Sequence, residues 1–206
     1  EAEYADIRRE IALSEKTGCP VHICHVSTAE SVALVRAAKR RDVRVTCETG
    51  PHYFWFTEEA ALSLDADYRM NPPLRTAADR QAVLEGLADG TIDCIATDHA
   101  PHAPEEKADF AAAPNGVVGL ETSLSASYTA LVEGEITDLC GLARLMSARP
   151  AKIAGIAGGS LAVGAPADLT LFDPAEAWVV RPEELHGKSK NTPFKGVQLH
   201  GRVRYT

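Results

Sequence analysis

Three residues that bind metals or move protons stand where apolar runs of the sequence end. His25 lies near the end of one run, His52 follows the next by a few residues, and Asp98 closes a third. In parallel α/β folds, ligands bind at the carboxyl ends of the strands. Imidazole and carboxylate groups held there by separate strands are what a metal site requires. These residues alone predict a metal-dependent hydrolase.

Each of these residues also has a simpler explanation. A single strand histidine is more often a core or hydrogen-bonded residue than a ligand, and His22 on the same run shows the ambiguity. A single aspartate can cap a helix or form a turn. A purely structural role explains the cluster of Asp98, His99 and His102 less well, because titratable groups are costly to bury without partners.

The elements that must position these residues follow an alternating order. Short β-branched runs at residues 21–26, 43–47 and 92–97 predict strands, and helical patterns separate them. This order is typical of βαβ units and a parallel sheet. Capping-box patterns stand at Ser27-Thr-Ala-Glu30 and Thr76-Ala-Ala-Asp79. The helices are predicted at residues 1–16, about 27–41, 57–63, after 76, 120–132 and 137–148.

Glycines become frequent after Pro150, and residues 167–172 and 197–205 read as antiparallel strands. We therefore predict two parts, an α/β part over residues 1–155 and a small β module over residues 156–206.

Composition narrows the classes of function. The 206 residues carry a net charge of −8, which argues against sequence-independent nucleic-acid binding. No apolar run approaches the roughly 18 residues that span a bilayer, so no membrane role is expected and the cytoplasm is the default location. Of five cysteines, Cys24, Cys47 and Cys94 lie in strand-like runs, where they are expected to act as small hydrophobes rather than disulfide partners.

Five motifs occur in a recognisable order: HICHVST (residues 22–28), TGPHY (49–53), MNPPLR (70–75), IDCIATDHAPH (92–102) and NTPF (191–194). Together they resemble the bacterial class I dihydroorotases of the amidohydrolase superfamily. The HVST stretch is shared with hydantoinases and allantoinases, whereas MNPPLR and TDHAPH are more specific. The resemblance covers the chain from Glu1 to Thr206 and implies the C-terminal part of a (β/α)8 TIM-like barrel, roughly its strands 6 to 8, followed by the β module.

The resemblance also implies roles for individual residues. His25 is the last histidine ligand of a two-zinc centre, and Asp98 binds the other zinc ion and shuttles the proton. Asn71 and His102 bind the pyrimidine substrate, and Gly116 lies in the loop whose backbone contacts its ring. The implied reaction is the reversible cyclisation of N-carbamoyl-L-aspartate to dihydroorotate in pyrimidine biosynthesis.

The sequence departs from the family pattern after its second strand. The usual pattern is Thr-Pro-His-His, but here Gly50 replaces the threonine and Tyr53 the second histidine. This puts any role of that second histidine in doubt. His52 is not a metal ligand in the family, so we expect it to have a structural or supporting role.

Several ligands of the family have no match in these residues: a His-x-His pair, a bridging carboxylated lysine or an aspartate, and a further histidine. A complete barrel takes roughly 250 residues, so we expect this chain to be the C-terminal half and to have little or no activity alone. The alternatives are a hydantoinase or allantoinase, and a non-catalytic fragment that binds a partner through its sheet edge. A homo-oligomer is expected from the unpaired edges, and an aspartate transcarbamoylase partner is left open.

Overall fold

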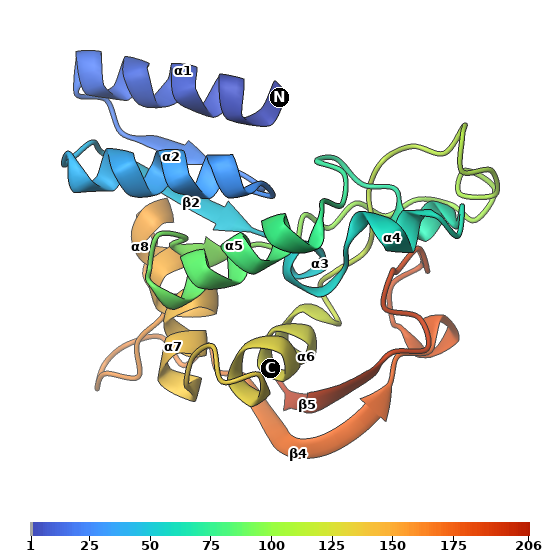
Figure 1. The fold of residues 1–206 in the computed structure, drawn as a ribbon. Coiled ribbons are helices and arrows are strands. Elements are labelled where there is room, and N and C mark those ends of the chain that lie inside the picture. Colours follow the sequence, from blue (N-terminus) through green and yellow to red (C-terminus); the bar gives the residue numbers. More distant parts are fainter. Residues whose placement is uncertain (1) are drawn as a thin grey trace.

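A three-stranded parallel sheet forms the centre of the structure, a computed structural model that describes residues 2–206 (Figure 1). The middle strand pairs in parallel with both of its neighbours. The parallel sheet predicted from the three apolar runs is therefore confirmed. The strands in sheet order are β1 (Val21–Ile23), β2 (Val45–Thr49) and β3 (Cys94–Ile95).

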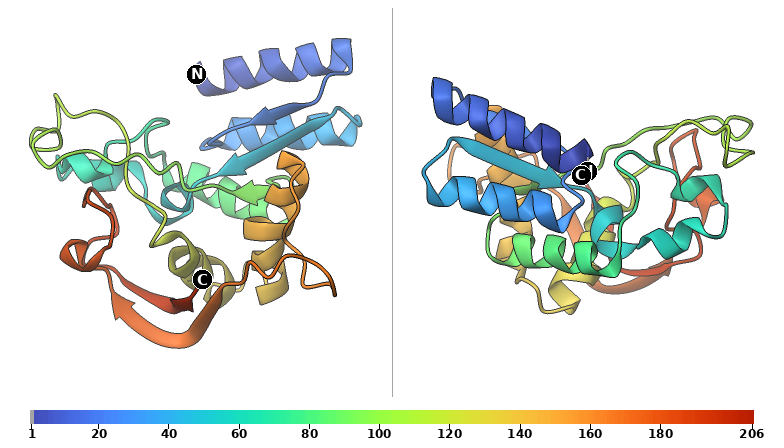
Figure 2. Two further views of the ribbon diagram at one scale, coloured as in Figure 1. Left: turned by 180° about the vertical axis from the view of Figure 1, so that it is seen from behind. Right: turned by 45° about the horizontal axis from the view of Figure 1, so that its top comes forward.

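Helices cover one face of this sheet. From behind, the strands lie in front of the helices α2 (Ala29–Arg40) and α5 (Ala77–Ala88) (Figure 2, left), and α1 (Ala2–Thr17) lies beside α2. Side chains alternate between the two faces of a strand. On β2 the residues facing the helices, such as Val45, are buried, whereas Glu48 on the opposite face is half-buried. The core thus lies between sheet and helices, and the other face of the sheet carries polar groups.

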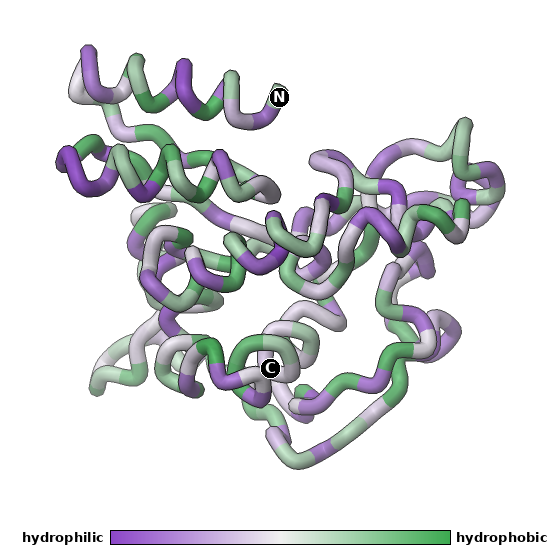
Figure 3. The backbone as a smooth tube through the Cα atoms, in the orientation of Figure 1, coloured by the Kyte–Doolittle hydropathy of each residue, from purple (hydrophilic) through white to green (hydrophobic). Residues whose placement is uncertain are grey.

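The α1 helix shows the pattern of an element with one buried face. Hydrophilic and hydrophobic residues alternate along its turns (Figure 3), and its buried residues are Ile7, Ile11 and Ser14. Their spacing of four and three residues places them on one side of a helix. Among the helices of residues 2–206, none is long and apolar enough to cross a membrane.

The start of α2 differs from the capping box predicted for Ser27 and Glu30. The N-cap is Thr28, whose hydroxyl accepts a hydrogen bond from the backbone N–H of Ser31 at 3.2 Å. The carboxylate of Glu3, on α1, accepts from the backbone N–H groups of Ser27 at 3.0 Å and Thr28 at 3.1 Å. In a capping box, a glutamate in the first turn of the helix accepts the hydrogen bond from the N-cap backbone. Here Glu3, which is distant in sequence, takes the place of Glu30 as that acceptor.

The capping box predicted at the start of α5 is confirmed. The Thr76 hydroxyl accepts from the backbone of Asp79, and the Asp79 carboxylate accepts from the backbone of Thr76. The second oxygen of that carboxylate accepts from the backbone N–H of Ala29 at 2.8 Å. Asp79 therefore ties the start of α5 to the start of α2.

The segment between β2 and α5, and the connection after β3, are mostly irregular. Of the helical turns predicted there, the one near residues 57–63 is observed as α4, and α3 was not predicted. The short elements of this region are α3 (Pro51–Trp55), α4 (Glu58–Ala61) and a 3-10 turn, Ala66–Tyr68.

The helices predicted at residues 120–132 and 137–148 are present but are interrupted by π-helical turns, and the second continues past Pro150. Pro150 directly follows the second π turn, and this local change of hydrogen bonding accommodates a residue that has no N–H to donate. Gly155, with φ of 67°, ends this helix. The elements are α6 (Ser123–Ser127), a π turn (Tyr128–Glu133), α7 (Leu139–Ala143), a second π turn (Arg144–Ala148) and α8 (Arg149–Ala154).

A two-stranded antiparallel ribbon, β4 (Leu171–Val179) and β5 (Gln198–Tyr205), follows. The first of these strands was predicted at residues 167–172, but it begins at Leu171 and does not end at Phe172. The strand instead continues, since the proline falls where the register between Asp173 and Ala177 is irregular. A 3-10 turn, Pro182–Glu184, lies between the strands. The boundary at residue 155 stays a prediction.

The hydrogen bonds from Ser27 and Thr28 to the Glu3 carboxylate predict a pH-dependent contribution to stability. Burial raises the pKa of Glu3, but hydrogen bonds from Ser27 and Ser31 and the charge of Arg75 outweigh it and lower the pKa below its ordinary value of 4.5. This stabilisation is present above pH 4.5 and is lost as the pH falls through the lowered folded-state value. We expect Glu3→Gln to reduce the free energy of unfolding by about 2 kcal/mol at pH 7, measured by urea denaturation.

Glu10→Gln is the matched control, because Glu10 lies on the same helix and, among residues 2–206, pairs with the exposed side chain of Arg9 and no other. It is expected to change stability by less than about 0.5 kcal/mol. The difference between wild type and Glu3→Gln is expected to shrink when both are measured below pH 4.5. A difference that stays constant with pH contradicts the role given to the carboxylate.

Candidate active site

The two predicted metal ligands, His25 and Asp98, share an uncommon backbone conformation. The φ angle is 58° at His25 and 47° at Asp98. Such angles are unfavourable for residues other than glycine and persist only where the surroundings fix them. His25 follows β1 and Asp98 follows β3, on opposite sides of the middle strand, yet Nε2 of His25 lies 3.5 Å from Oδ1 of Asp98. The structure therefore brings together the two side chains that sequence had assigned to metal binding.

This separation places both side chains at one candidate metal centre. It suits ligands of two neighbouring ions, which stand roughly 3.5–4 Å apart in two-metal sites. The other ring nitrogen of His25, Nδ1, is buried and has no well-formed hydrogen bond within residues 2–206. An imidazole nitrogen and a carboxylate oxygen are donors that divalent transition metals accept. The pair thus has the chemistry and spacing of part of a metal centre.

Glu48 on β2 was not singled out from the sequence, although it touches both histidines of β1. Its Oε1 lies 3.3 Å from Nδ1 of His25, and its Oε2 lies 3.2 Å from Nε2 of His22. Burial raises the pKa of Glu48, but the hydrogen bond from His22 and the charges of both histidines outweigh burial and lower it. Glu48 is therefore an ionised carboxylate at neutral pH, placed to orient the His25 ring.

A second group of possible ligands lies within the strands rather than beyond their ends. His22, Glu48 and Cys94 each offer an atom, and the three atoms lie within 4.8 Å of one another. The sequence contained the signal for this group: in parallel register, alternate residues of neighbouring strands share a face. Burial is the main cause that raises the pKa of the Cys94 thiol to about 12, and the charge of Glu48 adds to it.

The expectation that three cysteines act as small core hydrophobes is confirmed for Cys47, which lies in the apolar core, and is wrong for Cys24. Cys94 is buried, but its thiol lies beside the polar side chains of His22 and Glu48. Cys24 is exposed, because β1 ends at Ile23 and the chain turns there. Burial and the nearby carboxylate of Glu48 raise the pKa of the Cys24 thiol, so it stays protonated at neutral pH. All five cysteines are free thiols.

His52 occupies a buried position in α3. Burial lowers its pKa to about 3, and the charge of His25 acts in the same direction, so its ring is neutral at neutral pH. The ring fits because Gly50 has no side chain: a Cβ built on Gly50 comes within 2.7 Å of the His52 ring. The glycine that replaces the family's threonine is thus in direct contact with this histidine.

The predicted substrate-binding residues lie on adjoining loops. Asn71 is exposed, and its segment is held by the Tyr53 hydroxyl, which donates to the carbonyl of Pro72 at 2.8 Å. The backbone N–H of Gly116 donates to the carbonyl of Arg69 at 3.0 Å, which brings the loop of Gly116 against this segment. Among residues 2–206, no hydrogen bond or ion pair joins Asn71 to His102, so their joint role stays a prediction.

His102 lies beside the segment of Gly116. A Cβ on Gly116 meets the Cβ of Ala100 at 2.4 Å and Nε2 of His102 at 3.2 Å, and φ at Gly116 is 129°. Nε2 of His102 also lies 3.1 Å from the carbonyl oxygen of Asn115. Only glycine permits this close approach. The structure therefore places these two predicted residues together.

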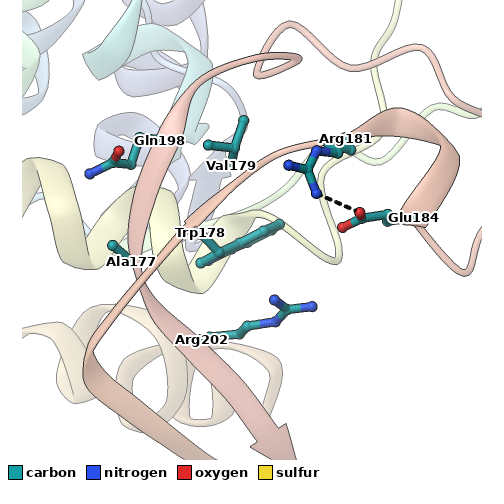
Figure 4. Close-up of a pocket in the computed structure, with 7 residues that line it drawn as sticks. All are labelled: Ala177, Trp178, Val179, Arg181, Glu184, Gln198 and Arg202. Carbon is teal, nitrogen blue, oxygen red and sulfur yellow. Dashed lines mark hydrogen bonds and ion pairs between the residues drawn. The ribbon is translucent and has the colours of Figure 1, made fainter.

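A surface pocket on the ribbon is separate from this site. It lies on β4, β5 and the turn between them and contains an Arg181–Glu184 ion pair of 2.8 Å (Figure 4). The guanidinium of Arg202 lies over the ring of Trp178, 5.4 Å from its centre. None of the predicted site residues lines it.

The sequence profile of the Amidohydrolase family matches residues 2–206. The chain belongs to the amidohydrolase family. Similar curated members are the dihydroorotase of Citrifermentans bemidjiense, which is 54% identical over 206 residues, and that of Acetivibrio thermocellus, 50% identical over 206 residues. Both alignments cover 100% of this chain and 48% of the relative. The chain thus spans about half the length of the curated relatives it matches.

Solved amidohydrolase structures give the same picture of the fold. The dihydropyrimidinase from Brevibacillus agri superposes with a TM-score of 0.92 at 28% identity, covering 97% of this chain and 46% of the other. The L-hydantoinase from Arthrobacter aurescens superposes with a TM-score of 0.91 at 32% identity. This superposition covers 98% of this chain and 48% of the hydantoinase. The predicted fold class, part of a (β/α)8 barrel of the amidohydrolase type, and the family resemblance read from the motifs are confirmed.

The close approach at Gly116 predicts that a methyl group there disrupts the loop. We expect Gly116→Ala to lower the free energy of unfolding by about 2–3 kcal/mol, from the unfavourable φ together with the overlap with Ala100. Gly18→Ala is the control, because Gly18 also has a positive φ, 72°, but has open space around it. Its expected loss is about 1 kcal/mol. Equal losses in denaturant titrations of the two variants contradict the packing role of Gly116.

Proposed function

We propose that this chain is part of a dihydroorotase, the enzyme that interconverts N-carbamoyl-L-aspartate and dihydroorotate. The observation that carries this proposal is the pairing of His25 with Asp98 at 3.5 Å, after the strands on either side of β2, in a chain whose curated relatives at 50–54% identity are named dihydroorotase. Since the chain spans about half of those relatives, the activity is proposed for the complete barrel. The segments that complete it supply the ligands without a match in these residues.

The proposed cofactor is zinc, with two ions in the complete centre. His25 would hold one ion, and Asp98 would contribute a carboxylate oxygen to the other. When bound, zinc would polarise a carbonyl and lower the pKa of a coordinated water to near neutrality. An imidazole and a carboxylate 3.5 Å apart, both donors that zinc accepts, support this assignment.

Asp98 is proposed to move the proton. In the hydrolytic direction its carboxylate accepts a proton from the attacking water and then delivers it to the ring nitrogen that leaves. The cyclisation runs the same steps in reverse. The side chain of Asp98 is partly exposed, so its free oxygen can reach a substrate lying over the strand ends.

Asn71, His102 and the backbone of Gly116 are proposed to hold the substrate. Their role is orientation, which converts a bound ring into one placed for attack. Dihydroorotate carries a ring carboxylate, and the imidazole of His102 and the amide of Asn71 are groups that bind such an anion. The closeness of Gly116 to His102 supports a shared role.

A homo-oligomer, an aspartate transcarbamoylase partner and a cytoplasmic location stay predictions.

A hydantoinase-type activity is the second candidate, because the solved structures that superpose on the chain are named dihydropyrimidinase and hydantoinase. Their identities of 28–32% are lower than the 50–54% of the dihydroorotases. Substrates separate the two candidates. An enzyme that hydrolyses hydantoin or dihydrouracil faster than dihydroorotate supports the second.

Asp98→Asn tests the proton transfer in a hybrid enzyme, in which this chain replaces the matching segment of the C. bemidjiense dihydroorotase. We expect kcat for dihydroorotate hydrolysis to fall by roughly 10²–10⁴-fold, because the amide cannot accept a proton. His186→Ala is the control: His186 is exposed, and within residues 2–206 its side chain has a polar contact with Glu121 alone, so kcat is expected to stay within about twofold. Full activity of a folded Asp98→Asn hybrid refutes the assignment.

His102→Ala in the same hybrid separates substrate binding from metal binding. We expect KM to rise about tenfold or more, from the loss of a hydrogen bond to a charged group. Zinc content, measured by elemental analysis together with intact mass, is expected to stay unchanged. Equal loss of zinc and of activity contradicts the role given to His102.

A further inference from the structure

Asn191 is a buried polar residue in the segment between the ribbon strands, far in sequence from every proposed site residue. Its side chain is 5% exposed. Its Nδ2 group donates to the carbonyl of Ala100 at 3.0 Å and to that of Gly116 at 3.1 Å. Its Oδ1 accepts from the backbone N–H of His102 at 3.2 Å. Both N–H donors of the side-chain amide and its oxygen acceptor are therefore hydrogen-bonded. All three partners belong to the loop that carries His102 and Gly116.

The backbone of Asn191 adds a fourth bond to the same loop. Its carbonyl accepts from the backbone N–H of Val118 at 2.9 Å. The residue therefore lies between the two sides of the loop, residues 100–102 and 116–118, and joins them. A buried amide with every polar atom paired is rigid, because any displacement leaves a buried group without a partner.

The Gly116 carbonyl is held from a second direction. Nζ of Lys107 donates to this carbonyl at 3.0 Å and to that of Pro114 at 3.0 Å. Lys107 belongs to the loop itself, whereas Asn191 belongs to the C-terminal part of the chain. Asn191 is therefore the contact through which the C-terminal part fixes the loop.

The segment of Asn191 is itself anchored on aromatic residues. Phe194 is 2% exposed and packs edge-on against Trp55, with ring centres 5.6 Å apart, and against Phe56 at 5.0 Å. The indole N–H of Trp55 donates to the carbonyl of Ala126 at 2.9 Å. This anchor extends from α3 to α6, so Asn191 is held by the body of the structure and not by the loop that it supports.

We infer that Asn191 is a positioning residue that fixes His102 and Gly116 for a cyclic amide substrate carrying a ring carboxylate. The inference rests on the proposed function for its substrate and on the hydrogen bonds above for its geometry. Asn191 touches neither His25 nor Asp98 in any described contact. Its removal therefore acts on substrate affinity and leaves the metal pair intact.

The first test measures the loop in the chain itself. We expect Asn191→Ala to speed amide hydrogen exchange at His102 and neighbouring loop residues by about tenfold, the effect of losing one hydrogen bond. Exchange in β2 is expected to stay unchanged. Gln198→Ala is the control, because Gln198 carries the same amide on β5, is exposed, and makes no bond to the loop. Unchanged exchange at His102 overturns the inference.

The second test measures KM and kcat in the hybrid. Asn191→Ala is expected to raise KM for dihydroorotate about tenfold, with kcat within threefold and zinc content unchanged. Asn191→Asp keeps the shape of the side chain but loses both N–H donors, so it is expected to raise KM to a similar extent. It replaces the alanine variant in this test if that variant does not fold. An unchanged KM, or a loss confined to kcat, overturns the inference. A wild-type hybrid without turnover contradicts the proposed function instead, and the exchange comparison then decides the positioning role.

Discussion

The carboxyl end of β2 is the constraint on which the candidate site depends. The backbone carbonyl of Glu48 accepts from the N–H of Val26 at 2.8 Å, and that of Thr49 accepts from the N–H of Ala96 at 3.0 Å. The Thr49 hydroxyl donates to the carbonyl of Val26 at 2.8 Å. The middle strand thus fixes the chain on both sides of it, immediately beside the turns of His25 and Asp98. Positive φ angles at those two residues persist because these bonds hold the flanking backbone.

The same strand explains why a polar site lies on one face of a sheet with an apolar core on the other. Along β2 the residues buried against the helices alternate with Thr46 and Glu48, which carry polar groups to the opposite face. The ring of His22 forms a hydrogen bond with each of them: Nδ1 lies 2.8 Å from the hydroxyl of Thr46, and Nε2 lies 3.2 Å from the carboxylate of Glu48. Hydrogen bonding among these groups satisfies them where apolar contact cannot. In a closed barrel this face is the lumen, into which catalytic groups from several strands converge.

The sequence predicted the parts of this arrangement that depend on local patterns. Alternating apolar runs predicted the parallel sheet, and because parallel strand ends meet at one edge, His25 and Asp98 were expected to lie close together. Glu48 escaped notice because a glutamate within a strand has no local signature, and its role depends on the register of β1 against β2. The cap of α2 was assigned to Glu30 for the same reason: the acceptor is Glu3, and only packing of α1 on α2 brings it there. Asn191 belongs to a quoted motif, but its hydrogen bonds span about ninety residues of sequence and no local pattern reports them.

The two sides of the candidate site are supported in physically different ways. His25 and Asp98 stand at strand ends held by the backbone ladder of the sheet, which suits ligands that must keep a fixed spacing. His102 and Gly116 stand on a long loop without such a ladder, apart from the single bridge of His99 with Val117. A loop of this length needs bonds from outside to keep one conformation. Arg69 supplies some of those bonds, and Asn191 supplies others. The C-terminal segment therefore belongs structurally to the site, although the predicted boundary near residue 155 would assign it to a separate part.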